Sequence, residues 1–113
     1  MSAFRPCILI PTYDNPRTIR DVVLAVRSIL PDVVVVDDAS GSENRAEVEK
    51  LGDEGLALVT FREVNGGKGA AVKTGFCFAR DHGFTHAIQV DADGQHALED
   101  ITKFLEIATE QPE

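Results

Sequence analysis

The sequence predicts an α/β fold, with a Rossmann-like and mostly parallel sheet flanked by helices. Short apolar runs alternate along the chain with longer segments of helical periodicity, which is typical of strands joined by helical crossovers. Residues 33–36 are consecutive valines, and such a β-branched run is typical of a strand covered on both faces. The 113 residues suffice for one compact domain and not for two, so residues 1–113 are expected to form a single domain.

Strands and helices are expected in strict alternation along the chain. The first helix has the clearest pattern, because its apolar residues recur on one face and Pro16 and Pro31 flank it, which suits a helix start and a helix stop. The strands are expected at residues 7–12, 32–38, 56–61 and 85–91, and the helices at residues 17–30, 43–51, 67–83 and 98–108.

The most unusual stretches of the sequence are the loops that follow the expected strands. Helical crossovers between parallel strands are right-handed, so these loops are expected to gather at one edge of the sheet. Ligands of open α/β sheets bind at that edge, outside the carboxyl ends of the strands. The loops read PTYDN, DDASGS, REVNGGKG and DADGQH, and the sequence therefore predicts a ligand site at this edge.

Composition narrows the class of ligand. The formal net charge of -8 argues against a nucleic-acid partner, which would require a basic face to neutralise phosphates. The apolar runs are too short to span a membrane and the N-terminus lacks a secretory signal, so the chain is expected to be cytoplasmic. Cys7 and Cys77 each lie in an apolar run without a CxxC pattern, and both are expected to be buried, reduced thiols.

The DADGQH stretch at residues 91–96 predicts a metal site. Asp91, Asp93 and Gln95 offer hard oxygen ligands of the type that Mg²⁺ or Mn²⁺ takes while keeping positions for water and phosphate. Alternation along an extended segment can point all three side chains to one side. The other interpretation is an acidic turn that caps a helix. His96 is expected to be structural rather than a metal ligand.

Two further loops carry weaker signals. Asp37 and Asp38 end the second expected strand, where a carboxylate can accept hydrogen bonds from a nucleobase or a ribose, or can simply form the turn. The stretch NGGKGAAVKTG fails the P-loop pattern because Gly69 follows Lys68, and it fails GxGxxG at Val72. Glycines, helix N-terminal amides and the Lys68 cation remain suited to an anion, or the segment is a flexible turn with a solvated lysine.

Taken in order, IPTYDN, VVDDAS, NGGKGAAVKTG and VDADGQH resemble the N-terminal half of a family 2 glycosyltransferase. The resemblance is closest to the branch with polyprenyl- and dolichyl-phosphate sugar synthases, and it covers residues 8 to about 108. It implies the nucleotide-binding half of a GT-A fold. It also implies an inverting transfer of sugar from a UDP- or GDP-sugar donor to an acceptor such as a lipid phosphate or a glycan.

The resemblance also implies roles for single residues. Pro11 and Tyr13 match residues that line the base pocket, and Asp37 and Asp38 match the acidic pair that reads base and ribose. Lys68 matches the lysine of the glycine loop, and the backbone around Ala92 is expected near the ribose. Asp91, Asp93 and Gln95 match the DxDxQ metal set, which uses Mg²⁺ or Mn²⁺ to neutralise the departing diphosphate.

Two departures from the family pattern limit the prediction. Asp14 and Asn15 stand where the family often has Asn-Glu, so no carboxylate is expected at position 15. The acceptor-binding half and the catalytic base of the family lie beyond the DxD region, so no catalytic residue is expected before Glu113. The chain alone is expected to be inactive, to self-associate through its exposed apolar surface, and in the full-length protein to lie at the membrane surface.

Two alternatives to a glycosyltransferase stay open at this point. A signalling receiver domain is also a small α/β module with an acidic pair at a strand end, but its pair normally follows the first strand and here it follows the second. A nucleotide-binding module without catalysis would share the donor site. Nucleotide binding without sugar transfer would distinguish that module from an enzyme.

Overall fold

The computed structural model describes residues 4–92. The expected helix at residues 98–108 lies outside the described residues, as do Asp93, Gln95 and His96. Strands and helices alternate through the described part of the chain, as predicted. They are β1 (Pro6–Thr12), α1 (Ile19–Arg27), β2 (Val33–Asp38), α2 (Ser42–Asp53), β3 (Leu58–Arg62), α3 (Gly67–Asp81) and β4 (His86–Gln89).

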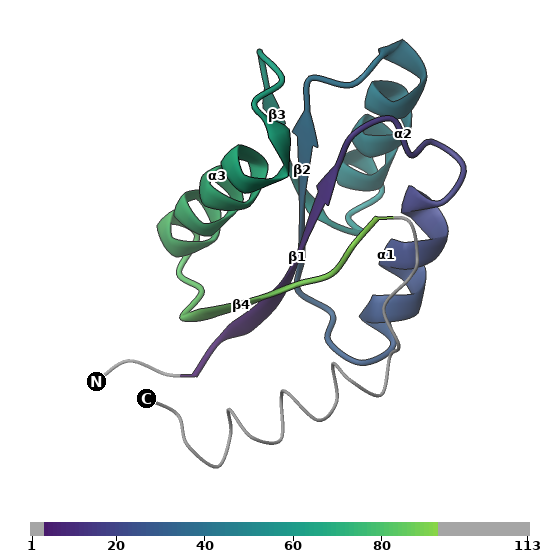
Figure 1. Cartoon of the computed structure of the whole chain (residues 1–113). Helices are drawn as coiled ribbons and strands as arrows, with labels where there is room; N and C mark the ends of the chain where they lie inside the picture. The colour runs from purple at the N-terminus through teal and green to yellow at the C-terminus, as the bar shows by residue number, and fades with distance from the viewer. Residues whose placement is uncertain (1–3, 93–113) are drawn as a thin grey trace.

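The strands form a 4-stranded parallel sheet in the order β3-β2-β1-β4. Ile8 in the central strand β1 pairs with Val33 of β2 on one side and Ile88 of β4 on the other. Helices α1 and α2 cover one face of the sheet and α3 covers the other (Figure 1). The predicted α/β class is therefore confirmed. The order also differs from the 2-1-3-4-5 order of receiver domains, which removes that alternative.

Side chains alternate along the central strands and build a core on each face of the sheet. Ile8, Ile10, Val33 and Val35 pack against α1 and α2. On the other face, a second group packs against α3. Its strand members are Cys7, Leu9, Val34 and Val36. Burial on both faces explains why β2 is continuously apolar up to its acidic end.

Some element bounds differ from the prediction. Helix α1 begins at Ile19 rather than at residue 17, because residues 16–18 form a turn in which the backbone N–H of Thr18 donates to the Asn15 carbonyl at 3.2 Å. Strand β4 ends at Gln89, so Asp91 lies in the segment after the strand rather than within it.

The prediction that both cysteines are buried is wrong for Cys77. Cys7 lies buried in β1, whereas Cys77 is exposed on α3. The face of α3 that meets the sheet is formed by Ala71, Gly75 and Ala79, which recur every four residues. Cys77 lies two positions from Gly75, and half a helical turn places it on the opposite, solvent-facing side.

Among the described residues, no helix combines the length and the apolar character needed to cross a lipid bilayer.

Candidate functional site

A pocket opens beyond the carboxyl ends of the strands. Its volume is about 370 Å³, within the range of small-molecule sites. Between β1 and β4 the chain reverses the direction in which it adds strands, and this switch point is where ligands bind in open α/β sheets. We call it the rim pocket, and it is lined by Pro11, Thr12, Tyr13, Asn15, Asp38, Asn65, Gly67, Lys68, Ala71, Asp91 and Ala92.

The loop between β1 and α1 presents Tyr13 at the mouth of the rim pocket, with 54% of the residue exposed. The Asn15 side chain folds this loop, because its Oδ1 accepts hydrogen bonds from Thr12 Oγ1 at 3.1 Å and from the Tyr13 N–H at 3.2 Å. Asp14 has a φ of 52°, a conformation that only a few residue types adopt outside glycine. Tyr13 therefore projects from a tightly turned loop with an apolar ring available for stacking.

The loops after β1 and β2 are tied together. The Asp14 N–H donates to Ser40 Oγ at 2.9 Å, and Asp14 Oδ1 accepts from the Gly41 N–H at 2.8 Å. The Asn15 N–H also donates to Asn44 Oδ1 at 3.0 Å. These reciprocal bonds fix one side of the rim pocket before any ligand binds.

Asp37 and Asp38 have different surroundings because adjacent strand residues point to opposite faces. Asp37 is fully buried and accepts hydrogen bonds from Asn44 Nδ2 at 2.7 Å and from the Ser40 N–H at 3.1 Å. It holds the turn into α2 and is not among the lining residues of the rim pocket. Asp38 lines the pocket, so the structure brings only one of this acidic pair to the site.

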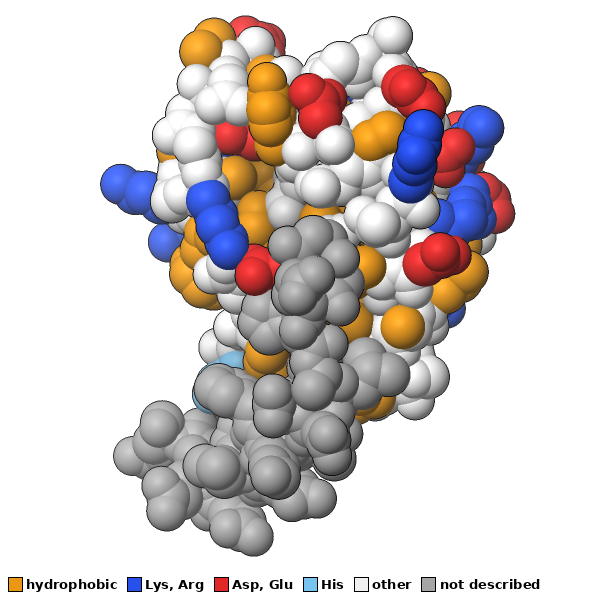
Figure 2. Space-filling view, turned by 45° about the vertical axis from the view of Figure 1, so that its right-hand side comes forward, with side chains coloured by type: hydrophobic (Ala, Val, Ile, Leu, Met, Phe, Trp, Pro, Cys, Tyr) orange, Lys and Arg blue, Asp and Glu red, His pale blue; other side chains and the backbone are white. Residues whose placement is uncertain are grey.

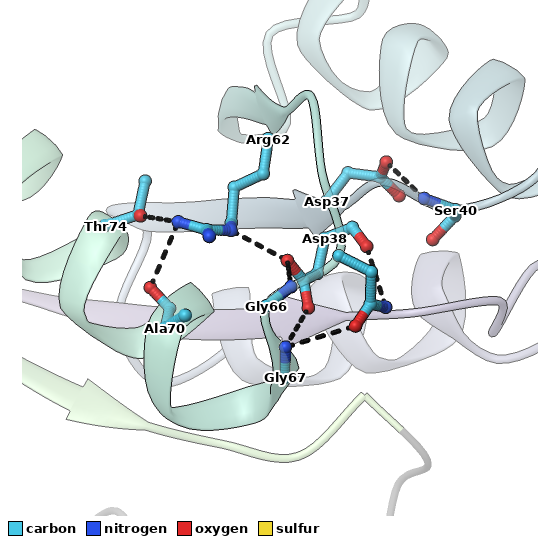
Figure 3. A network of polar contacts seen from close by, with 9 residues as sticks. Asp37, Asp38, Ser40, Arg62, Gly66, Gly67, Ala70 and Thr74 are labelled. Atoms are coloured by element: carbon cyan, nitrogen blue, oxygen red, sulfur yellow. Dashed lines mark hydrogen bonds and ion pairs between the residues drawn. The ribbon is translucent and has the colours of Figure 1, made fainter.

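Asp38 is the centre of a polar network on the α3 side of the sheet (Figure 3). Its Oδ1 accepts from Arg62 Nε at 2.7 Å and from the Gly66 N–H at 3.2 Å, and its Oδ2 accepts from the Gly67 N–H at 3.0 Å. Asp38 is 3% exposed, and a buried carboxylate of this kind requires a paired cation and hydrogen bonds. The network fastens the glycine loop to the end of β2.

At the other side of the mouth, Lys68 and Asp91 form an ion pair. Lys68 is the second residue of α3, and Asp91 follows β4. The two side chains are 59% and 29% exposed. The structure thus confirms that the glycine loop and the acidic segment lie side by side. It places the Lys68 cation at the N-terminus of α3, and both the cation and the positive end of the helix dipole are suited to an anion.

Ala92 lies next to this pair and its carbonyl accepts a hydrogen bond from Thr18 Oγ1 at 2.7 Å. This bond anchors the segment after β4 to the turn that precedes α1. The segment is thereby fixed at the pocket wall, where Ala92 and Asp91 both line the rim pocket.

One predicted donor for a divalent metal lies in the described part of the pocket. The Asp91 carboxylate is a hard oxygen ligand of the type that Mg²⁺ and Mn²⁺ take, and it lies at the mouth of the pocket. In the part of the chain that the structure describes, no three His, Cys, Asp or Glu side chains form a metal-binding group. The two remaining predicted ligands, Asp93 and Gln95, lie outside the described residues, so Asp91 is the one member of the predicted metal set that the described residues place at the pocket.

The face shown in Figure 2 carries acidic and basic side chains interspersed with one another. Such a mixed surface contrasts with the basic stripe typical of nucleic-acid binding. The net charge of -8 contrasts with the positive charge of such proteins as well.

Sequence reasoning missed several residues that build the site. Asn15 and Asn44 shape the loops, and Arg62 and Asn65 surround Asp38. Asn65 is the first residue of the NGGKGAAVKTG stretch, so the sequence could have assigned it to the site. Arg62 directly follows the apolar run of residues 56–61 and is the last residue of β3. Its pairing with Asp38 depends on the register of β2 and β3, in which these two residues are direct partners.

Residues 7–113 match the family described as "Glycosyl transferase family 2". The chain belongs to this family. Its predicted likeness to family 2 glycosyltransferases is thereby confirmed.

Individual relatives agree with this assignment. The chain is 33% identical over 106 residues to the polyprenol monophosphomannose synthase of Mycolicibacterium smegmatis, with 90% of this chain and 40% of the relative covered. It is 29% identical over 113 residues to the UDP-N-acetylglucosamine–dolichyl-phosphate N-acetylglucosaminyltransferase of Methanococcus voltae, with 88% of this chain and 45% of the relative covered. The chain therefore spans less than half the length of these two curated relatives.

Solved structures share the fold. The crystal structure of S. aureus TarS 1-349 matches with a TM-score of 0.69 at 24% identity, covering 95% of this chain and 33% of that one. The same protein in complex with UDP matches with a TM-score of 0.66 at 25% identity, covering 94% of this chain and 33% of that one. These structural neighbours confirm the fold expected from the resemblance.

Proposed function

We propose that this chain binds the nucleotide part of a nucleotide-sugar donor and serves as the donor half of an inverting glycosyltransferase. The observation that carries the proposal is the rim pocket, which has a carboxylate, Asp38, on one wall and the Lys68–Asp91 ion pair at its mouth. A nucleoside diphosphate has the matching order of groups, with hydrogen-bond donors at its base and negative charge at its other end. Membership of family 2 and the UDP complex of a structural neighbour support this assignment.

The base and ribose would lie in the part of the pocket formed by β1 and β2. Pro11 and Tyr13 supply apolar surface against the base, and Asp38 accepts a hydrogen bond from it. Asp37 acts as a positioning residue, because it holds the Ser40 and Asn44 turn that supports the loop of Tyr13. The backbone of Ala92 faces the ribose.

The diphosphate would lie between the N-terminus of α3 and the segment after β4. Lys68 provides a positive charge there, and the positive end of the helix dipole lies at the same place. Asp91, together with Asp93 and Gln95, would hold Mg²⁺ or Mn²⁺, which when bound supplies Lewis-acid stabilisation of the departing nucleotide. Lys68 pairs with Asp91 in this structure. A metal held by Asp91 would replace the lysine as the partner of that carboxylate, and Lys68 could then turn towards the phosphates.

The acceptor and the remaining chemistry belong to the whole protein. Two relatives carry names that combine a sugar with polyprenol or dolichyl phosphate, so we propose a lipid phosphate as the acceptor, with a glycan as the alternative. A lipid acceptor would place the full-length protein at the membrane surface on its cytoplasmic side. The base that takes a proton from a hydroxyl acceptor is expected in the acceptor-binding half of the family.

The test is isothermal titration calorimetry of the 113-residue chain with UDP and GDP, in Mn²⁺, in Mg²⁺ and in EDTA. We expect one of the nucleotides to bind with metal and to lose at least about tenfold in affinity in EDTA, because the diphosphate would face Asp91 without a neutralising cation. Equal affinity in EDTA would contradict the metal assignment. Absence of binding by either nucleotide to the folded chain would contradict the proposed function.

A further inference from the structure

The Asp38 carboxylate has almost exhausted its capacity to accept hydrogen bonds. An ionised carboxylate offers about four lone-pair sites, two on each oxygen. Oδ1 accepts from Arg62 Nε at 2.7 Å and from the Gly66 N–H at 3.2 Å, which uses both of its sites. Oδ2 accepts from the Gly67 N–H at 3.0 Å. Among the described residues this leaves one acceptor site, on Oδ2, for a ligand in the pocket that Asp38 lines.

Further contacts hold Arg62 in this position, so its hydrogen bond to Asp38 Oδ1 is part of an organised network. Its Nη1 donates to the Ala70 carbonyl at 3.4 Å and to Thr74 Oγ1, both on α3 (Figure 3). Its side chain is 25% exposed. The glycine at position 66 makes room for it, since a Cβ there would come within 2.7 Å of Arg62 Nη2 and 2.9 Å of Ala70 Cβ.

The number of free acceptor sites discriminates between nucleobases. Guanine presents an N1–H and an N2 amino group side by side, and a carboxylate binds both donors by offering both of its oxygens. Uracil presents a single imide N3–H between two carbonyls. With Oδ1 committed to Arg62, Asp38 can satisfy the one donor of uracil but leaves one donor of guanine unpaired in a buried place, which carries a desolvation cost.

We propose that Arg62 is a specificity-determining residue, which restricts the pocket to a base with a single imide N–H and so selects a uridine diphosphate donor over a guanosine diphosphate donor. The inference rests on the proposed nucleotide-binding function and adds the class of the donor to it.

Asn65 complements a uracil in the same place. Its Nδ2 donates one N–H to the Asp38 carbonyl at 3.2 Å, and its Oδ1 accepts from the Gly67 N–H at 3.2 Å. The amide carries a second N–H, which has no acceptor among the described residues, and Asn65 lines the rim pocket. A uracil whose N3–H meets Asp38 has a carbonyl on either side, and one of them can accept this N–H.

The direct test uses the unmodified chain and three ligands, UDP, N3-methyl-UDP and GDP, titrated by calorimetry in Mn²⁺. N3-methylation removes the imide N–H and leaves the diphosphate unchanged. We expect N3-methyl-UDP and GDP each to bind at least about tenfold more weakly than UDP, the loss typical of one unpaired buried hydrogen-bonding group. GDP binding as tightly as UDP, or N3-methyl-UDP binding like UDP, would overturn this inference alone. Loss of binding by all three would contradict the proposed function on which it rests.

A variant tests the part played by Arg62. Arg62→Met removes the donor to Oδ1 at a similar side-chain length, and Arg20→Met is the matched control, because Arg20 pairs with Glu54 on the surface. We expect Arg62→Met to reduce the ratio of UDP to GDP affinity about tenfold or more towards unity, and Arg20→Met to leave that ratio unchanged. An equal loss for both nucleotides in Arg62→Met would show a purely structural role and overturn the proposal. If Arg62→Met does not fold, the comparison of UDP with N3-methyl-UDP on the unmodified chain decides.

Discussion

Two adjacent carboxylates at the end of β2 face different surroundings, although the sequence offers them as a pair. Asp37 turns towards the loop into α2 and bonds to Asn44, whereas Asp38 turns towards the glycine loop and bonds to Arg62. The alternation of strand side chains predicts that the two differ. It does not predict which of them lines the rim pocket, because that depends on where the neighbouring loops run. The motif therefore identifies the edge of the sheet, and the hydrogen bonds show that Asp37 supports the turn into α2 while Asp38 lines the rim pocket.

The two cysteines give a prediction at the same scale. Burial, with Asp32 as a smaller cause, raises the pKa of the Cys7 thiol from 9.0 to about 11. Between these values the unfolded chain has released the proton and the folded chain still holds it. The stabilising contribution is therefore complete below about pH 9 and is lost as the pH rises towards 11.

We expect the free energy of unfolding to fall by about 2 kcal/mol more in the unmodified chain than in Cys7→Ala between pH 8 and pH 11. Urea denaturation at both pH values measures it. Comparing the two pH dependences cancels the cost of the cavity that Cys7→Ala creates. Cys77→Ala is the matched control, because Cys77 is exposed, and it should keep the pH dependence of the unmodified chain. A Cys7→Ala variant with that same pH dependence would contradict the account.

Helix α3 illustrates what an element contributes to the site. It must lie close to the sheet for the loop at its N-terminus to reach Asp38 and Asp91, and its buried positions are the small residues Ala71, Gly75 and Ala79. A Cβ added at Gly75 would come within 2.9 Å of Val36 Cγ2 and closer still to Leu9. The absence of a side chain at this position therefore sets the distance between helix and sheet.

Two substitutions in α3 test this packing. Gly75→Ala should lower the free energy of unfolding by about 1–3 kcal/mol, because the added methyl group overpacks a filled interface. Gly69→Ala is the matched control in the same helix, since nothing lies within 4 Å of a Cβ at that position. It should be neutral or stabilising by up to about 1 kcal/mol through helix propensity. Equal stability of the two variants in urea denaturation would refute the argument.

Sequence patterns predicted the existence of the described elements better than their ends. The helical period of α1 is clear in the sequence, but the residues of its predicted first turn belong to a loop that Asn15 folds through hydrogen bonds. Hydrophobic periodicity carries no information about such bonds. The error over Cys77 has a related cause. Cys77 lies in an apolar run of α3, and this run alone does not show which side of the helix meets the sheet. The close approach of Gly75 to the sheet shows it.

For the whole molecule, the handedness of the crossovers was enough to predict that the loops after the strands share one rim. The order β3-β2-β1-β4 was not predicted, and it decides which loops are neighbours on that rim. The pairing of Asp38 with Arg62 also follows from the register of β2 and β3. Long-range pairing of this kind involves residues far apart in the chain, so a local pattern carries no information about it.

Asp38 and Asp91 line the same rim pocket. This placement supports the proposal that one ligand contacts Asp38 with its base and Asp91 with its diphosphate. The direct measurement is calorimetry of Asp38→Ala and Asp91→Ala with uridine and UDP across a series of Mn²⁺ concentrations. Asp38→Ala should weaken both ligands by about 1–3 kcal/mol at every metal concentration, because it removes a hydrogen bond to the base. Asp91→Ala should spare uridine, weaken UDP most at low Mn²⁺, and be partly rescued by excess metal. Metal-dependent rescue of Asp38→Ala together with metal-independent loss in Asp91→Ala would contradict the account.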